Sequence, residues 1–101
     1  MTPTRFLDLA ESELDEAIAY FNRQVAGLGD RFQREVEATV ALITEYPEIG
    51  SPITKRVRKF RVRKFKHKVI YVFDGAEIII IAVAHHKKRP RYWRRRIPQR
   101  I

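Results

Sequence analysis

The sequence of 101 residues contains no cysteine. Disulfide scaffolds, zinc–thiolate sites and cysteine nucleophiles are therefore excluded. The longest apolar run, from Ile78 to Ala84, has seven residues, whereas a helix that crosses a bilayer needs about 20. The N-terminus has no basic stretch followed by an apolar segment, so no secretory signal is recognisable. We expect one cytoplasmic domain, residues 1–101, with no cofactor, no metal and no membrane contact.

Acidic residues are scarce in the second half of the chain. Residues 51–101 contain two acidic and 17 basic residues, whereas residues 1–50 contain ten acidic and four basic residues. The two halves therefore carry +15 and −6, within a total of +9. The positive charge is concentrated in two blocks, Lys55–Lys68 and Lys87–Arg96. This asymmetry favours a polyanionic or acidic partner, nucleic acid above all. An idle basic surface that keeps the protein in solution is the alternative.

Hydrophobic residues in the first half recur with helical spacing. They predict an amphipathic helix over residues 13–25, with Ser12 as its N-cap, and a second helix over residues 29–45. Two glycines interrupt the pattern between the helices, and Pro47 ends the second one. Because the interruption is short, the helices are expected to form an antiparallel hairpin. A short strand over Phe6–Leu9 is predicted before them, and a loop over residues 46–52 after them.

The hydrophobic period changes to two after residue 52. Strands are predicted over residues 57–63 and 68–73, and over 78–84, where every residue is apolar and both faces should be buried. A tight turn at residues 64–66 and an Asp74-Gly75 hairpin turn connect them. The tail is expected to form a short basic segment or helix packed by Trp93. The predicted fold is α+β, with a helical hairpin packed on a small twisted antiparallel sheet.

The predicted hairpin gathers titratable residues at its open end. Pairing across the Asp74-Gly75 turn, with residue numbers that sum to about 150, places His67 opposite Val83 or Ala84. His85 and His86 follow at the same end, but adjacent residues of a continuing strand face opposite sides. At most one of these two histidines is therefore expected to face a site, and each is as readily structural as catalytic.

The residue types at this end suit chemistry on RNA. Attack by the 2′-hydroxyl on the neighbouring phosphate needs a base, cations and an acid. Histidine or a crowded lysine can move the proton, arginine binds phosphate through two N–H groups, and tyrosine can stack on a nucleobase. The candidate catalytic residues are Lys68, His85, His86, Arg89 and Tyr92. The candidate nucleic-acid contacts are Arg61, Arg63, Lys66, His67, Lys87, Lys88, Arg94 and Arg95. Solvated cations without a ligand are the alternative for the second group.

Several segments, in their order along the chain, resemble the RelE/ParE superfamily of type II toxin–antitoxin toxins. They are the glycine-containing segment 27–32 between the helices, the Tyr-Pro-Glu-Ile-Gly segment 46–50, the block 57–73, and segments 82–86 and 89–93. The resemblance covers nearly the whole chain. It implies a helical hairpin on a twisted antiparallel sheet. It also implies a growth inhibitor that a cognate antitoxin protein neutralises.

The resemblance implies two alternative targets. RelE-like members cut mRNA on the ribosome, whereas ParE-like members poison DNA gyrase and lack the nuclease site. RelE-like nucleases carry an arginine in a tyrosine-arginine-x-x-tyrosine strand, where this chain has Lys68. Arg89 and Tyr92 match a later arginine and a terminal tyrosine, and some relatives use a histidine near His85 or His86 as the acid.

The histidines and cations make ribosome-dependent mRNA cleavage the leading hypothesis, with the chain as an endoribonuclease and the ribosome and mRNA as partners. A DNA gyrase poison without chemistry of its own is the first alternative. An inactive basic nucleic-acid-binding module is the second.

Overall fold

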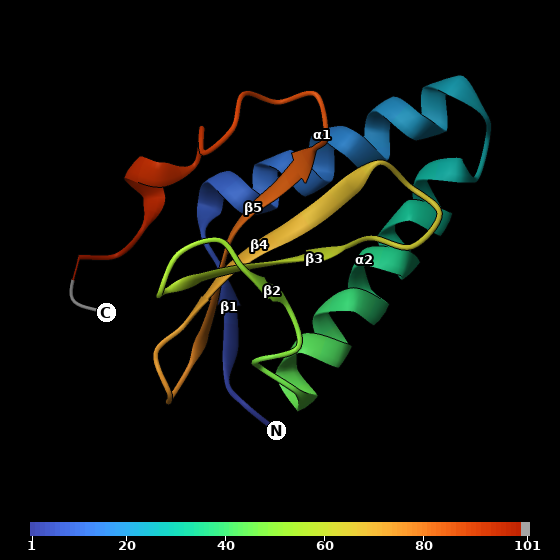
Figure 1. The fold of residues 1–101 in the computed structure, drawn as a ribbon. Coiled ribbons are helices and arrows are strands. Elements are labelled where there is room, and N and C mark those ends of the chain that lie inside the picture. The colour runs from blue at the N-terminus through green and yellow to red at the C-terminus, as the bar shows by residue number, and fades with distance from the viewer. Residues whose placement is uncertain (100–101) are drawn as a thin grey trace.

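The computed structural model describes residues 1–99 and has an α+β architecture (Figure 1). The elements, in chain order, are β1 (Thr4–Phe6), α1 (Asp8–Gln24), α2 (Leu28–Glu45), β2 (Ser51–Pro52), β3 (Val57–Arg61), β4 (His67–Phe73), β5 (Ile78–His85) and a 3-10 helix, η1 (Arg94–Arg96). In Figure 1 the two helices are joined at one end, and the red C-terminal tail lies on the opposite side of the molecule from α2. The predicted helical hairpin on a small sheet is confirmed.

Close contact between α1 and α2 depends on a glycine. A Cβ atom at Gly29 would collide with the backbone oxygen of Ile18 and with the side chain of Asn22. The N–H of Gly29 donates a hydrogen bond of 2.7 Å to Oδ1 of Asn22, which satisfies a backbone donor in the first turn of α2. Gly27 reverses the chain between the helices with a φ of 86°, a conformation that glycine adopts without steric cost.

The first helix begins earlier than the sequence predicted. The strand expected over Phe6–Leu9 ends at Phe6, and α1 begins at Asp8 instead of residue 13. The N–H of Leu7 still donates to the carbonyl of Ile80 in β5, at 2.9 Å, so Leu7 is the last residue held by the sheet. Ser12 lies inside α1 and is not its N-cap. Three of the four residues at positions 6–9 are apolar, which concealed this junction.

The sheet is mixed, whereas the sequence predicted a small twisted antiparallel sheet. Its strand order is β1-β5-β4-β3-β2, and β1 runs parallel to β5 with Thr4 opposite Ile78. The other pairs are antiparallel. Parallel pairing is possible because a long connection, which includes both helices, separates β1 from β5. The short β2 lies in the segment predicted to be a loop, and β3 ends at Arg61 instead of Arg63.

An irregularity in β5 changes the pairing at the end of the hairpin. Next to the turn, Phe73 pairs with Ile78, but the register shifts between Tyr71 and Ile70. The extra residue in β5 moves the pairing by one position, as a β-bulge does. His67 therefore lies opposite His85, one residue beyond the predicted partners Val83 and Ala84.

Buried side chains form a core on each face of the sheet. The core on the helix side contains Phe32, Val36 and Ile43 of α2 together with Val69 and Ile80 of the sheet. The core on the other face contains Ile70, Val72, Ile79, Ile81 and Trp93 of the tail. β5 is thus buried on both faces, as predicted from its uninterrupted apolar sequence, and Trp93 packs the tail as predicted.

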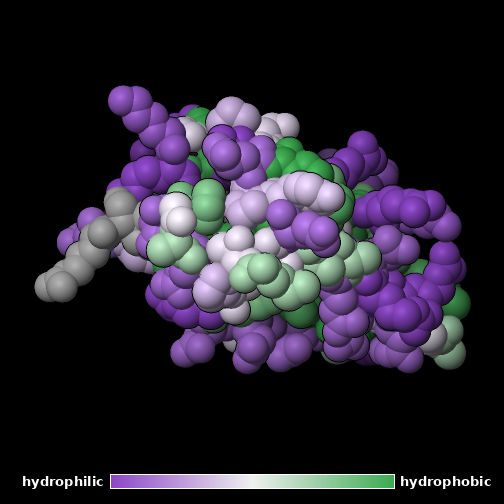
Figure 2. Space-filling model, turned by 90° about the horizontal axis from the view of Figure 1, so that it is seen from below, coloured by the Kyte–Doolittle hydropathy of each residue, from purple (hydrophilic) through white to green (hydrophobic). Residues whose placement is uncertain are grey.

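One face of the protein is shown in Figure 2. Figure 2 shows one end of the molecule, where neutral and weakly hydrophobic residues gather near the centre and hydrophilic residues surround them. No helix among residues 1–99 is long and apolar enough to cross a membrane.

Candidate functional site

Three histidines meet at the end of the β4–β5 hairpin. The ring centroid of His85 lies 4.9 Å from that of His67 and 4.5 Å from that of His86. β5 ends at His85, and the N–H of His86 then donates to the carbonyl of Lys66 at 2.9 Å. Because the strand does not continue, the two adjacent histidines do not alternate between faces. We call these three residues the histidine cluster.

His67 is part of the hydrophobic core. Only 9% of the residue is exposed, and its ring packs against those of Phe21 and Phe32, with centroids 5.7 and 4.8 Å away. Its Nδ1 atom is buried without a hydrogen-bond partner among the described residues. Burial, and to a lesser extent the charges of His85 and His86, lower the pKa of His67 to about 4. The imidazole is therefore neutral near pH 7 and has little access to a phosphate.

One ring nitrogen of His85 accepts a hydrogen bond from the backbone. Its Nδ1 accepts a hydrogen bond of 3.0 Å from the N–H of Lys87. The proton of the neutral ring therefore lies on Nε2, which can donate a hydrogen bond but cannot act as a base in this tautomer. Burial lowers the pKa of His85 below its ordinary value, with further contributions from His86, Lys87 and Lys66. The ring is thus mainly neutral at pH 7.

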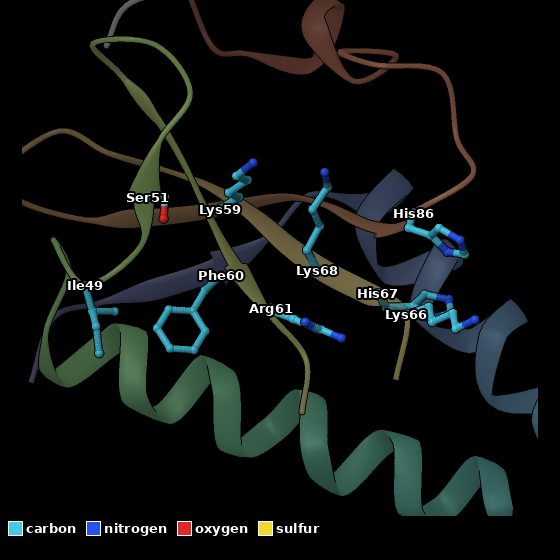
Figure 3. Close-up of a pocket in the computed structure, with 9 residues that line it drawn as sticks. All are labelled: Ile49, Ser51, Lys59, Phe60, Arg61, Lys66, His67, Lys68 and His86. Atoms are coloured by element: carbon cyan, nitrogen blue, oxygen red, sulfur yellow. The ribbon is translucent and has the colours of Figure 1, made fainter. Parts of the chain in front are cut away.

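A basic hollow of about 690 Å³ lies between the strands and the histidine cluster (Figure 3). In Figure 3, Lys59 and Lys68 project to the same side, while Phe60 points toward α2 near Ile49. The residues that line this strand hollow are Ile49, Ser51, Lys59, Phe60, Arg61, Lys66, His67, Lys68 and His86. None of them is acidic, so the hollow suits an anion that also has an apolar part.

The strand hollow includes residues that the sequence prediction missed. Lys59 and Arg61 are two positions apart on β3 and therefore share a face of the strand, a signal that could have identified Lys59. Ile49 and Ser51 join the lining only because β2 returns to pair with β3, which no local pattern indicated. Arg63 lines a neighbouring hollow of about 610 Å³ beside α2, together with Arg61.

The predicted residues of the tail lie elsewhere. Arg89, Tyr92, Arg94 and Arg95 line a separate hollow of about 570 Å³, which we call the tail hollow. None of them lines the strand hollow. Lys87 and Lys88 are exposed in the turn that connects β5 to the tail. The structure therefore brings Lys66, Lys68 and His86 together but does not bring Arg89 and Tyr92 to them.

Tyr92 is engaged within the protein. Its hydroxyl donates a hydrogen bond of 2.7 Å to Oε2 of Glu13 in α1. Burial and this carboxylate raise the pKa of Tyr92 well above its ordinary value, so the phenol stays protonated. Lys88 Nζ and Arg96 Cζ lie over its ring, 5.4 and 5.1 Å from the centroid. The ring is therefore covered by cations of the same chain.

Glu13 holds the tail against the sheet. Arg96 donates to both oxygens of Glu13, at 2.9 and 3.1 Å, and the backbone N–H of Val83 donates to Oε1 at 3.0 Å. Arg96 also donates to the carbonyl of Ile81 at 3.0 Å. The sequence prediction missed Glu13 and Arg96, because no local pattern connects residues so far apart in the chain.

The site offers binding groups for anions more clearly than it offers acid–base chemistry. No group of three or more histidine, aspartate or glutamate residues within residues 1–99 is arranged to hold a metal ion. His67 and His86 line the strand hollow together with three lysines and an arginine, Lys59, Lys66, Lys68 and Arg61. Two separate basic regions result, one on the strands and one on the tail.

Comparison with known proteins gives the family. Residues 4–90 match the family model described as the ParE toxin of the type II toxin–antitoxin system, parDE. No curated protein matches the chain. A solved structure titled "Chromosomal ParDE TA system from P. aeruginosa" is similar to it, with a TM-score of 0.73 and 13% identity over 84% of this chain and 96% of that chain. At this identity the structural likeness shows the fold alone, but the family model covers most of the sequence. The chain belongs to the ParE toxin family of type II toxin–antitoxin systems.

Proposed function

We propose that this chain is a growth-inhibiting toxin that poisons DNA gyrase in the cytoplasm and has no nuclease centre of its own. Membership of the ParE family carries the proposal, because ParE-like members of the superfamily poison gyrase and lack the RelE-like nuclease site. The neutralising partner is the antitoxin of the same system. An acidic segment of that antitoxin would complement the +15 half of the toxin.

The positions of the candidate catalytic residues also support this proposal. RNA cleavage requires an acid, a base and cations around one phosphate. Arg89 lines the tail hollow instead of the strand hollow, and Tyr92 is bonded to Glu13. Lys68 stands where RelE-like nucleases have an arginine, and it lacks the planar donor pair of a guanidinium.

Gyrase and supercoiled plasmid provide the test. The purified toxin is incubated with both, and linear DNA is measured after denaturation of the enzyme. We expect linear DNA only when toxin and gyrase are both present, and less of it after addition of the antitoxin. A His85→Ala/His86→Ala variant should trap gyrase as well as the wild-type protein does, because the proposal assigns these histidines no chemistry.

Ribosome-dependent mRNA cleavage is the second candidate, because His86, Lys66 and Lys68 line one basic hollow. It predicts cut transcripts within minutes of induction, and loss of growth arrest in the His85→Ala/His86→Ala variant. Cut transcripts without trapped gyrase would contradict our proposal. An absence of growth arrest by the wild-type chain would favour the inactive nucleic-acid-binding module instead.

A further inference from the structure

The tail hollow is a second concentration of unpaired positive charge. Its lining consists of Arg89, Pro90, Arg91, Tyr92, Arg94 and Arg95, and it encloses about 570 Å³. None of these residues is acidic. Within residues 1–99, the salt bridges of the structure involve Arg5, Arg58 and Arg96, and no arginine of the tail hollow. Four guanidinium groups thus surround one recess without an internal counter-charge from the described residues.

The backbone under these arginines is held in place. Trp93 is 3% exposed and anchors the tail in the core of the second sheet face. Tyr92 and Arg96 bind Glu13, as described above. The N–H groups of Arg94 and Arg96 donate to the carbonyls of Arg91 and Trp93, at 3.0 and 2.8 Å. The anchoring residues Tyr92, Trp93 and Arg96 flank the exposed Arg94 and Arg95. The guanidinium groups are therefore presented from a fixed support, which lowers the entropy lost when a ligand binds.

The chemistry of the lining favours phosphate over an acidic protein segment. A guanidinium offers two parallel N–H donors that match two phosphate oxygens. Protein interfaces usually bury apolar and aromatic residues at their centre, and the strand hollow has such residues in Phe60 and Ile49. The tail hollow has no aliphatic side chain besides the ring of Pro90, and Tyr92 is already bonded to Glu13.

We infer that the tail hollow binds the phosphodiester backbone of a nucleic acid. This inference rests on the proposed function for its biological meaning, since a toxin that acts on gyrase engaged with DNA gains from its own contact with that DNA. The contact depends on backbone phosphates and is therefore independent of base sequence. It lies away from the histidine cluster and needs no chemical step.

Fluorescence anisotropy of a short labelled DNA duplex tests the inference with the full chain. The test variant is Arg94→Ala/Arg95→Ala, in which both arginines are exposed. The matched control is Arg31→Ala/Arg34→Ala on α2, which removes the same charge from two other exposed arginines. We expect the tail variant to bind at least about tenfold more weakly, because it lacks charge-assisted hydrogen bonds to phosphate. The slope of log affinity against log salt should fall by about 0.9 for each phosphate that the variant no longer neutralises.

A second labelled ligand, a single-stranded RNA of equal charge, separates the two sources of phosphodiester. Weaker binding of either one by the tail variant supports the site, and the more tightly bound of the two identifies its nucleic acid. Equal weakening by the tail and α2 variants would overturn the inference, since only net charge would then matter. Displacement of the duplex by polyglutamate at equal charge concentration would also overturn it, in favour of an acidic protein. Melting curves of all variants verify that each is folded.

The binding experiment tests the tail hollow independently of the proposed function, because duplex binding is measured without gyrase. Tail-dependent binding without trapped gyrase would retain the site and reject the gyrase proposal. Trapped gyrase together with unchanged duplex binding by the tail variant would support the gyrase proposal and reject the phosphate site on the tail. A Lys59→Ala/Arg61→Ala variant in the strand hollow completes the set: loss of binding in this variant alone would assign the phosphate site to the strands and overturn the inference.

Discussion

His67 shows how one buried side chain links the stability of this protein to pH. Its pKa is about 4 in the folded protein, against an ordinary value of 6.5. Between these values the unfolded chain binds a proton that the folded chain does not bind. The free energy of unfolding therefore falls as the pH falls from 6.5 to 4, by up to about 3 kcal/mol for this residue. Above pH 6.5 the contribution is constant.

Replacement of His67 by phenylalanine should remove this dependence. The new ring fits an aromatic environment formed by Phe21, Phe32 and Phe65, and the buried Nδ1 without a partner disappears. We expect His67→Phe to raise stability by about 1 kcal/mol at pH 7, and by more at pH 5. Urea denaturation at both pH values measures the change. A variant that retains the wild-type difference between pH 7 and pH 5 would show that another group titrates.

A glycine at the start of α2 allows this helix to approach α1 closely. Gly29 lies against the backbone of Ile18, and its N–H binds the side chain of Asn22. The side chain of Asn22, near the end of α1, therefore caps the beginning of α2. The N-cap residue of α2 itself, Gly27, has no side chain that could do so. Any side chain at position 29 must separate the helices, because the nearest obstacle is backbone and cannot rotate away.

Gly29→Ala should consequently destabilise the hairpin, although alanine is the better helix former. We expect a loss of about 2–3 kcal/mol, typical of overpacking that forces a backbone shift. Thermal unfolding followed by circular dichroism measures it. Gly75→Ala is the control for glycine loss in general, because a Cβ at Gly75 would meet no atom within 4 Å and only its φ of 93° is unfavourable. An equal or smaller loss at Gly29 would show that the helices can separate without penalty.

The carboxylate of Glu13 connects three distant parts of the protein, α1, β5 and the tail. The side chains of Arg96 and Glu13 are 15% and 18% exposed, so this ion pair is largely shielded from water. Removal of one partner from a buried pair costs several kcal/mol, because the other charge remains without compensation. The exposed pair between Arg5 and Glu77, with side chains 53% and 38% exposed, should contribute much less.

Glu13→Ala should therefore release the tail from the sheet. We expect a loss of about 2–4 kcal/mol and faster amide hydrogen exchange at Val83, whose N–H donates to Glu13. Arg5→Ala should cost less than about 1 kcal/mol and leave this exchange unchanged. Exchange measured by mass spectrometry on peptides from residues 81–96 tests both. Undisturbed protection of this region in Glu13→Ala would mean that Trp93 alone secures the tail.

Local patterns of the sequence were sufficient for some of these features and insufficient for others. Helical spacing placed α2 within one residue of its bounds, and the uninterrupted apolar run predicted that β5 is covered on both faces. The parallel pairing of β1 depends on a partner strand more than 70 positions away in the sequence. The spacing of hydrophobic residues within a helix or a strand cannot indicate such a distant partner. The bulge that brings His67 opposite His85 is a departure from the regular hairpin register on which the predicted pairing was based.

The candidate site was also predicted only in part from the sequence. Lys66, Lys68 and His86 were grouped correctly because a hairpin turn fixes which segments are neighbours. The tail was misplaced, because the bonds from Tyr92 and Arg96 to Glu13 turn it away from the histidine cluster. Those bonds connect residues about 80 positions apart, which spacing in the sequence cannot indicate.

The pairing of β1 with β5 has a consequence for biosynthesis. Thr4, Arg5 and Phe6 pair only with residues 78–80, so β1 has no sheet neighbour until β5, the last strand in chain order, has been synthesised. Contacts between such distant residues form slowly, because loop closure must precede them. The nascent toxin thus cannot complete its sheet until most of the polypeptide has been translated, and a product truncated before Ile78 leaves its amino-terminal strand without a neighbour.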